Sequence, residues 1–280
     1  MAGILYLCAT PIGNLEDMTY RCVRILKEVD LIAAEDTRNS LKLLNHFEIN
    51  TPMTSYHEFN KIEKAKKLIE QLLAGKDIAV ITDAGTPGIS DPGEELVAMC
   101  YGEGIEVRTI PGAAACITAI TSSGQSCRRF SFEAFLPKDK KERNRVLQEM
   151  TEETRTMVVY ESPHHLKATL SELQDVLGNR EITLCRELTK KYEEKQKTTL
   201  QEAIAYYQEH DPKGEYVLVI AGKSKAQVME EQKSRWENIS IEEHMEMYLQ
   251  QNLSKKDAMK AVAKDRGVRK RDIYQALLSN

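Results

Sequence analysis

Short apolar runs and segments of helical periodicity alternate along the first 120 residues. The apolar runs are continuous, which is typical of strands buried on both faces of a parallel sheet. The segments between them repeat apolar residues every three or four positions, as an amphipathic helix does. We predict an α/β unit with strands at Gly3–Cys8, Leu31–Ala34, Ile78–Ile81 and Ile105–Ile110, and helices at Thr19–Val29, Lys61–Leu73, Glu94–Cys100 and Ala113–Thr121.

A second α/β unit follows a polar connector at Thr121–Arg129. Its strand patterns mix alternating and continuous apolar residues, which favours a sheet that is only partly parallel. The polar segment Thr189–Lys197 is compatible with either a strand or a loop. The predicted strands are Phe130–Phe135, Thr156–Tyr160, Glu181–Cys185 and Tyr216–Ile220, and the predicted helices run from the segment 161–165 to Leu177 and over Leu200–Tyr207.

The chain after Gly222 has only helical patterns. Its Ser254–Arg271 segment resembles a helix-turn-helix in spacing and charge, although a structural helical cap with a solvated basic face explains it equally well. We therefore predict three domains, at 1–120, 121–222 and 223–280. The expected helices of the last domain are Ile241–Gln250, Ser254–Lys264 and Lys270–Leu278, with Ser240, Ser254 and Asp257 as caps.

The loop Ile81–Gly93 (ITDAGTPGISDPG) is the strongest candidate for a ligand site. Its glycines let the backbone approach a bound molecule closely, and Asp83 and Asp91 add negative charge, which suits a nucleoside-like or cationic ligand better than a polyphosphate. The spacing matches neither GxxxxGK[ST] nor GxGxxG. Asp91 and Pro92 are expected to cap the following helix. The alternative interpretation is a rigid structural turn.

Other loops follow predicted strands in the same way. They include ATPIGNLED at 9–17 and PGAAA at 111–115, and Leu31–Ala34 is followed directly by Glu35, Asp36 and Arg38. The carboxyl ends of parallel strands line one crevice, so we expect these loops to face the same ligand. The charged residues after Ala34 are equally compatible with a helix cap and a local ion pair. In the polar segment Thr54–Asn60, Tyr56 and His57 are candidate substrate contacts.

Composition narrows the functional classes. The chain has 280 residues, is 41% hydrophobic and carries a net charge of -4, as ordinary globular proteins do. Six cysteines without a CxxC pair, together with scattered histidines, indicate neither a metal site nor a disulfide framework. We find no apolar segment long enough to span a membrane and no signal peptide, and expect a cytoplasmic protein. Basic residues concentrate at 128–145 and at Lys255–Arg271, where they can contact phosphates or simply be solvated.

Four motifs in one order resemble a known family. They are ATPIGNLED at 9–17, AAEDTR at 33–38, DAGTPGISDPG at 83–93 and YESPHH at 160–165, with CREL at 185–188. Together they resemble the tetrapyrrole-methylase-like S-adenosylmethionine-dependent methyltransferases, and within them the branch that 2′-O-methylates a cytidine of small-subunit ribosomal RNA. The resemblance extends over nearly the whole chain. It implies a two-domain α/β fold with mixed sheets and a small C-terminal helical domain, S-adenosylmethionine in the cleft between the domains, a homodimer, and ribosomal RNA or the small ribosomal subunit as the partner.

The resemblance also implies roles for particular residues. Its cofactor segments correspond to Pro11, Gly13, Asp83, Ala84, Gly85, Thr86, Gly88, Ser90, Asp91, Pro111, Gly112 and Ala113. Glu35 and Glu161 are the favoured catalytic residues, because a hydroxyl nucleophile needs a proton acceptor. The expected substrate contacts are Arg38, His57, His164, Arg186, Lys255, Arg269 and Lys270. One departure is visible, since the chain has PGAAA at 111–115 where the family commonly has PGPSA, so no serine hydroxyl is available there.

Two other functions remain compatible with the sequence. The same fold could methylate a tetrapyrrole or another small molecule, although a small acceptor has no need of the basic C-terminal helices. Alternatively, the chain could be a ribosome-assembly factor that keeps the fold and has lost the chemistry. Transfer of a labelled methyl group to RNA distinguishes these functions from the first.

Overall fold

The computed structural model describes residues 1–280 except 59–60, 92, 235, 237 and 279–280. Its contacts divide the chain into two compact units. The first comprises Met1–Thr151 and Arg155–Ala221, and the second comprises Glu152–Thr154 and Gly222–Asn280. In the described part of the chain, no helix is both long enough and apolar enough to cross a membrane.

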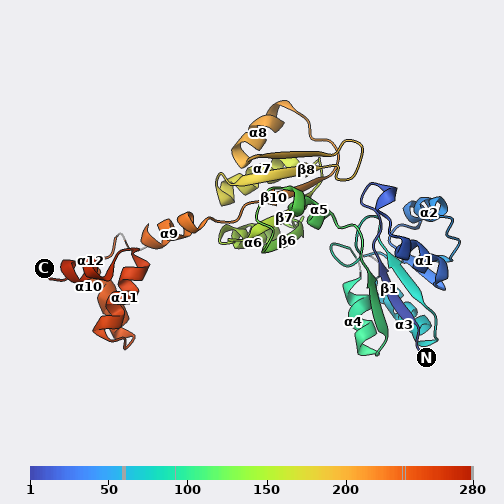
Figure 1. Ribbon diagram of the computed structural model, residues 1–280, viewed down its shortest axis with the longest axis horizontal. Coiled ribbons are helices and arrows are strands. Elements are labelled where there is room, and N and C mark those ends of the chain that lie inside the picture. Colours follow the sequence, from blue (N-terminus) through green and yellow to red (C-terminus); the bar gives the residue numbers. More distant parts are fainter. Residues whose placement is uncertain (59–60, 92, 235, 237, 279–280) are drawn as a thin grey trace. The chain divides into compact units, whose positions relative to one another are not determined.

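A five-stranded parallel sheet forms the amino-terminal half of the first unit (Figure 1). The strand order is β3-β2-β4-β1-β5, and every neighbouring pair is parallel. All five carboxyl ends therefore lie at one edge of the sheet. The strands are β1 (Ile4–Cys8), β2 (Leu31–Ala34), β3 (Met53–Ser55), β4 (Ile78–Ile81) and β5 (Glu106–Ile110).

Helices cover both faces of this first sheet. Alternate residues of β1 point to opposite faces of the sheet. Leu5 and Leu7 pack in one core with α3 and α4, and Tyr6 and Cys8 pack in the other core with α1 and α2. Burial of both faces explains why β1, β2 and β4 are continuous apolar runs, whereas the edge strand β5 is polar and largely exposed. The elements are α1 (Tyr20–Glu28), α2 (Thr37–His46), α3 (Lys61–Leu73) and α4 (Glu94–Gly102), with a short 3-10 helix, η1 (Leu15–Asp17), before α1.

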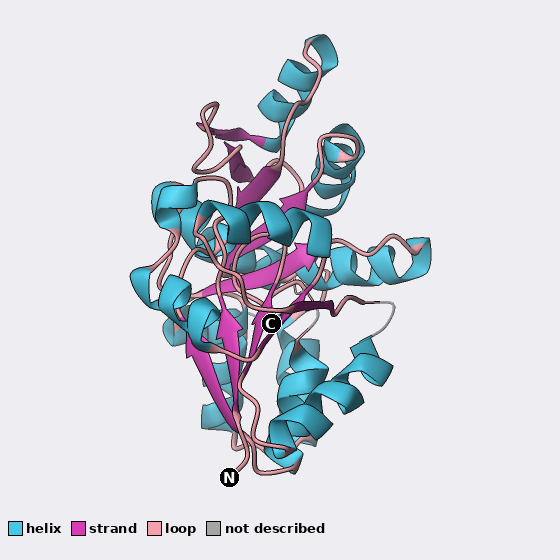
Figure 2. Ribbon diagram, turned by 90° about the vertical axis from the view of Figure 1, so that its right-hand side faces the viewer, coloured by secondary structure: helices cyan, strands magenta, loops and turns pink. Residues whose placement is uncertain are grey.

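The second sheet of the first unit is mixed, as predicted. Its order is β6-β7-β10-β8-β9, in which β6 and β7 are parallel and the other neighbours are antiparallel. Figure 2 shows the strands of both sheets with helices on their faces. The strands are β6 (Phe130–Phe135), β7 (Thr156–Glu161), β8 (Glu181–Arg186), β9 (Glu194–Thr199) and β10 (Tyr216–Ile220).

One face of the second sheet packs against three helices and the other against α5. The larger core contains Leu218 and Ile220 of β10, whereas Val217 and Val219 pack on the opposite face with residues of α5. Although α5 follows the first sheet in the chain, its buried residues thus belong to the core of the second. The helices are α5 (Ala115–Ser122), α6 (Lys140–Thr151), α7 (Leu166–Leu177) and α8 (Leu200–Glu209).

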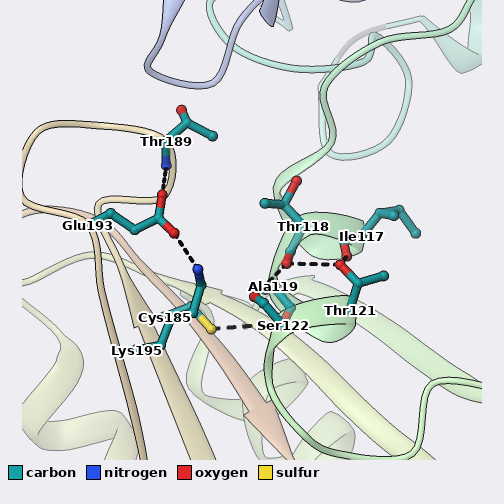
Figure 3. A network of polar contacts seen from close by, with 9 residues as sticks. All are labelled: Ile117, Thr118, Ala119, Thr121, Ser122, Cys185, Thr189, Glu193 and Lys195. Atoms are coloured by element: carbon teal, nitrogen blue, oxygen red, sulfur yellow. Dashed lines mark hydrogen bonds and ion pairs between the residues drawn. The ribbon is translucent and has the colours of Figure 1, made fainter.

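Figure 3 shows polar contacts within α5 and one between α5 and strand β8. The Thr121 hydroxyl donates to the carbonyl of Ile117 at 2.8 Å, one turn earlier in the helix. The Cys185 thiol of β8 points toward the carbonyl of Ala119, with the sulfur 4.0 Å from the oxygen. A hydroxyl that donates to a carbonyl of its own helix needs no other partner. Thr121 of α5 therefore adds no unpaired polar group.

The second unit contains α9 (Lys225–Ser234) and a helical cluster of α10 (Ile241–Gln250), α11 (Lys255–Asp265) and α12 (Lys270–Ala276). Met245, Val262 and Ile273 form the centre of its small core. The predicted caps Ser240 and Ser254 are confirmed, because each side chain accepts an N–H of the first turn. The predicted cap Asp257 is wrong: it lies in the first turn of α11 and accepts the Ser254 hydroxyl at 2.7 Å.

Most predicted elements are confirmed: several have the predicted bounds, such as Leu31–Ala34 and Lys61–Leu73, and ends predicted at a stated residue shift by at most two residues. The sequence pattern missed α2, β3 and α9 and did not separate α6 from a polar loop. The expected capping of α4 by Asp91 is wrong, because Gly93 occupies that position without a side-chain bond; Pro92 lies outside the described residues, as does Asn60. The polar segment 189–197, for which the sequence allowed either a strand or a loop, contains both: it begins with a turn and continues into β9. The three predicted domain boundaries stay predictions.

Two glycines of the first unit should respond oppositely to alanine. A Cβ at Gly112 would lie 2.7 Å from the Cβ of Ala9, and neither backbone can retreat easily. Gly112→Ala should destabilise the protein by about 1–3 kcal/mol, through steric overlap. At Gly102, the last residue of α4, a Cβ meets nothing within 4 Å, so Gly102→Ala should stabilise by about 0.4–1 kcal/mol. Urea denaturation measures both; equal shifts for the two variants would contradict the packing described here.

Candidate functional site

One cavity of the first unit lies where loops from both sheets meet. It has a volume of about 310 Å³, at the lower end of the range for small-molecule sites. Its lining comes from the carboxyl ends of six strands and from the start of β10. The lining residues are Ile12, Glu35, Asp83, Ala84, Gly85, Thr86, Ile89, Ser90, Asp91, Ala114, Ala115, Phe135, Tyr160, Glu161, Ser162, Glu215, Tyr216 and Val217.

Backbone hydrogen bonds join the loops after β1 and β4. The N–H of Thr10 donates to the carbonyl of Gly85 at 2.8 Å, and the N–H of Gly85 donates back at 3.1 Å. The Thr10 hydroxyl also donates to the carbonyl of Thr82 at 3.0 Å. Gly85 has φ +84°, a conformation that favours glycine, and a Cβ there would lie 3.4 Å from Ile12. A glycine is therefore needed at this position for the loops to pair.

A side-chain bond connects the same central loop to the loop after β5. The Thr86 hydroxyl donates to the carbonyl of Ala113 at 3.0 Å. Ala114 and Ala115, which open α5, then border the cavity with side chains no larger than a methyl group. Three loops that are far apart in the chain are thus fixed to one another by hydrogen bonds.

The polar part of the lining is acidic. Glu35, Asp83, Asp91, Glu161 and Glu215 border the cavity, and the described lining residues include no lysine or arginine. Burial and the charges of Glu35 and Asp83 raise the pKa of Asp91 to about 6. Burial also raises the pKa of Glu35, with further contributions from the charges of Asp83 and Asp36, although the N–H of Asp83 donates to Glu35 at 3.3 Å and opposes the shift. These shifts show carboxylates that lack a cation nearby.

Glu161 is held by donors on both carboxylate oxygens. One oxygen accepts the N–H of Ser162 at 2.7 Å, and the other accepts the hydroxyl of Thr169 at 2.6 Å. The guanidinium of Arg143 donates to the Thr169 oxygen at 2.7 Å. Because an arginine can only donate, the single proton of Thr169 is directed to Glu161. The carboxylate is therefore fixed in position at the cavity wall.

The remaining wall is apolar and aromatic. The Tyr160 ring packs edge-to-face against Phe132 and Phe135, with centroid distances of 4.9 and 5.6 Å. Its hydroxyl accepts the N–H of Cys116, in the first turn of α5, at 3.0 Å, and burial raises the pKa of Tyr160. A cavity with an apolar wall and several carboxylates suits an organic cation of moderate size. It does not suit a phosphate, because the described lining residues include no basic side chain.

Comparison with known proteins identifies the family. The family of Tetrapyrrole (Corrin/Porphyrin) Methylases matches residues 4–204. The chain belongs to the tetrapyrrole methylase family.

Relatives within the family are similar over nearly the full length. A protein of Halalkalibacterium halodurans is 50% identical, over 97% of this chain and 93% of the relative, and one of Bacillus subtilis is 47% identical, over 98% and 94%. Both relatives are named Ribosomal RNA small subunit methyltransferase I.

Solved structures share the tetrapyrrole methylase fold at low sequence identity. Diphthine synthase superposes with a TM-score of 0.61 at 12% identity, covering 81% of this chain and 94% of that one. Uroporphyrin-III C-methyltransferase from Thermus thermophilus, solved with S-adenosylhomocysteine, has a TM-score of 0.56 at 18% identity and covers 78% and 97%. The predicted fold class is confirmed.

Eight of the residues predicted for the methylase site line the cavity, including both catalytic candidates. The eight are Glu35, Asp83, Ala84, Gly85, Thr86, Ser90, Asp91 and Glu161. Six others lie in the same loops but do not line it, namely Pro11, Gly13, Gly88, Pro111, Gly112 and Ala113. Two of these are closely packed against side chains, because a Cβ on Gly13 would overlap the Lys190 side chain and one on Gly112 would overlap the Cβ of Ala9. Their roles in binding stay predictions.

The predicted substrate contacts of the first unit lie outside the cavity lining. Arg38 is 89% exposed and pairs with Asp36, which caps α2. Arg186 donates to Glu194 at 2.8 Å, His57 is half-buried, and His164 is exposed beyond β7. The alternative interpretation of a cap with a local ion pair thus describes Asp36 and Arg38, and Arg38 lowers the pKa of Asp36 to about 2.

Sequence reasoning missed ten lining residues. Most are apolar or aromatic, and their types give no functional signal outside the three-dimensional context. A signal existed for six of them: Ile12, Ala114 and Ala115 lie inside the cofactor segments 11–13 and 110–115 that the family resemblance implies, and Ile89, Tyr160 and Ser162 lie inside the quoted motifs. Glu215 follows the glycine before β10. The missed residues are Ile12, Ile89, Ala114, Ala115, Phe135, Tyr160, Ser162, Glu215, Tyr216 and Val217.

We expect Asp91→Asn to stabilise the ligand-free protein in a pH-dependent way. The pKa of Asp91 is raised from 3.8 to about 6, so its ionised form is disfavoured in the native state. The loss of folding stability that Asp91 causes is absent below about pH 4, grows as the pH rises to 6 and is complete above about pH 6. Allowing for partial exposure, the gain should be about 1 kcal/mol at pH 8. Urea midpoints at pH 8 and pH 4 measure it, with the exposed Asp17→Asn as a charge control; a gain equal at both pH values would contradict this origin.

Proposed function

We propose that this chain is an S-adenosylmethionine-dependent methyltransferase that methylates the 2′-hydroxyl of a cytidine in small-subunit ribosomal RNA. The observation that carries the proposal is the acidic, partly apolar cavity, built from the shared motifs, in a chain that matches named ribosomal RNA methyltransferases from end to end. The RNA substrate rests on those names, and the neighbour solved with S-adenosylhomocysteine supports the cofactor.

The residues of the cavity fit a sulfonium nucleoside. When bound, S-adenosylmethionine supplies an electrophilic methyl group on a positively charged sulfur. The carboxylates of Asp83 and Asp91 provide negative charge for a cation, and the ionised form of Asp91, whose pKa is raised, becomes more favourable once the cation is present. Gly85 and Ala84 border the cavity with no side chain larger than a methyl group, and the Tyr160 ring, packed against Phe132 and Phe135, supplies an apolar wall. Positioning in a dry site can lower the barrier by several kcal/mol.

Of the two catalytic candidates, Glu35 is the better proton acceptor. Both oxygens of Glu161 already accept strong hydrogen bonds, whereas Glu35 accepts only one long bond from Asp83 among the described contacts. A raised pKa also makes Glu35 more basic at neutral pH. We therefore assign the proton of the ribose hydroxyl to Glu35, and to Glu161 a fixed negative charge at the wall.

Basic residues outside the cavity complete the proposal. Arg38, His57, His164 and Arg186 contact the RNA around the first unit, and Lys255, Arg269 and Lys270 contact it from the second. Lys255 and Arg269 are exposed at the starts of α11 and α12, although Arg269 also pairs with Asp272. The family resemblance further supports a homodimer in the cytoplasm.

Labelled-methyl transfer tests the function directly. Cofactor with a tritiated methyl group should label small ribosomal subunits, with the label in RNA at a cytidine 2′-oxygen. Gly85→Val should abolish binding of S-adenosylhomocysteine in calorimetry, because a branched side chain at φ +84° breaks the pairing with Thr10. Label in a tetrapyrrole acceptor instead of RNA, or tight cofactor binding without any transfer, would reject the RNA methyltransferase.

The assignment of Glu35 predicts a specific kinetic change. Glu35→Gln should lower kcat by about 10²–10⁴, since general-base catalysis contributes that much, and should leave KM for RNA nearly unchanged. Glu161→Gln is the matched comparison and should act mainly on KM for the cofactor. Single-turnover methyl transfer at saturating RNA measures the chemical step, and wild-type kcat in Glu35→Gln would remove this residue from the reaction.

A further inference from the structure

An irregularity in β6 aims one aromatic side chain at the cavity. The pairing of β6 with β7 shifts register between Phe132 and Ala134, which marks a β-bulge. Ala134 has φ +51°, an unfavourable conformation for a residue with a Cβ. Bulges of this kind frequently lie next to active sites, where they redirect a side chain.

The bulge puts Phe135 on the same face of the sheet as Phe132. Phe132 pairs with Val158 and Phe135 with Tyr160, so the two rings stand on one face although they are three residues apart. Both rings contact Tyr160. Phe135 nevertheless remains 58% exposed and lines the cavity. The strained conformation at Ala134 lowers the stability of the fold, and the exposed Phe135 ring adds little to the core in return. A strained backbone of this kind indicates a functional role for the ring.

Unpaired lysines follow Phe135 directly. Lys138, Lys140 and Lys141 are exposed, and among the described residues none of them forms an ion pair or a side-chain hydrogen bond. The neighbouring acid, Asp139, instead accepts the N–H of Glu142 at 2.9 Å. Three residues span at most about 10 Å, so Lys138 stays close to Phe135.

The arginines farther along α6 behave differently. Arg143 pairs with Glu172, and Arg145 pairs with Glu142 and Glu149. Free positive charge in this segment is therefore concentrated beside the cavity. Because the cavity lining itself is acidic, the sign of the charge reverses between the interior and this border.

We propose that Phe135 and the three lysines form the docking surface for the RNA strand that enters the cavity. The Phe135 ring stacks on a base, and Lys138, Lys140 and Lys141 bind the adjoining phosphates. Single-stranded RNA is recognised by this combination of an exposed aromatic ring and flanking basic side chains. The inference rests on the proposed function and names the surface that receives its polyanionic substrate, apart from the acidic interior that receives the cationic cofactor.

Charge removal tests the lysines. The triple variant Lys138→Gln, Lys140→Gln, Lys141→Gln should bind a small-subunit RNA fragment more weakly and should reduce the slope of log affinity against log salt by about 2, for three phosphate contacts at 0.7 each. Its affinity for S-adenosylhomocysteine should equal that of the wild type. The control removes equal charge elsewhere, at Lys42, Lys66 and Lys76, which lie outside the cavity lining, and should keep the wild-type slope.

Substitution of the ring tests stacking separately. Phe135→Ala should weaken RNA binding by about 5- to 150-fold, the usual loss for one base–aromatic stack, and Phe135→Trp should restore it. Phe135→Leu keeps apolar bulk without the aromatic face and should resemble alanine. Because the ring is largely exposed, unfolding midpoints should change little in all three variants.

The outcomes separate this inference from the proposed function. If the wild type methylates RNA but the lysine and Phe135 variants keep its RNA affinity and salt slope, the docking surface is wrong and the function stands. If the wild type binds RNA through these residues without methylating it, the docking surface stands and the function fails. If the wild type binds a protein of the subunit through this surface instead of RNA, the docking surface is rejected. If the wild type binds no RNA at all, both are rejected.

Discussion

The reciprocal hydrogen bonds between Thr10 and Gly85 are the constraint on which the site depends. They join the loops of two adjacent strands, β1 and β4, which are separated by more than 70 residues in the chain. The Thr86 bond to Ala113 adds the loop after β5 to the same assembly. These bonds tie the three loops together at one sheet edge, and such preorganisation reduces the cost of ordering on binding.

Charge within the cavity is arranged at a cost to stability. The charge of Asp83 contributes to raising the pKa of both Glu35 and Asp91, and no lysine or arginine of the described lining relieves the repulsion. A folded protein tolerates such a cluster where a cation is to be bound, because the ligand then supplies the missing positive charge. Glu161 differs, since Ser162 and Thr169 satisfy its carboxylate within the protein.

The second sheet contributes the part of the site that involves irregular backbone. Ala134 in β6 and Thr189 after β8 both have positive φ, and Thr189 is β-branched, so its conformation is particularly unfavourable. The first brings Phe135 to the cavity, and the second lies against Gly13 of the ATPIGN loop, where a Cβ would sit 2.9 Å from the Thr189 hydroxyl. Two of the strained positions thus lie next to loops or strands of the site, and the regular cores of both sheets compensate for them.

The sequence by itself determined the strands, the helices of strong periodicity and the order of the motif loops, because these depend on local patterns that any fold must satisfy. It also identified Glu35, Asp83, Asp91 and Glu161, since charged residues at strand ends and in glycine-rich loops are visible in one dimension. Only the tertiary structure decided that Tyr160, Phe135, Tyr216 and Val217 complete the wall, and that Arg38 lies outside it with Asp36 as its partner. The physical reason is that the cavity wall depends on which faces of separate strands lie next to each other. The bulge in β6 changes the face on which Phe135 lies, and it leaves no pattern in the sequence.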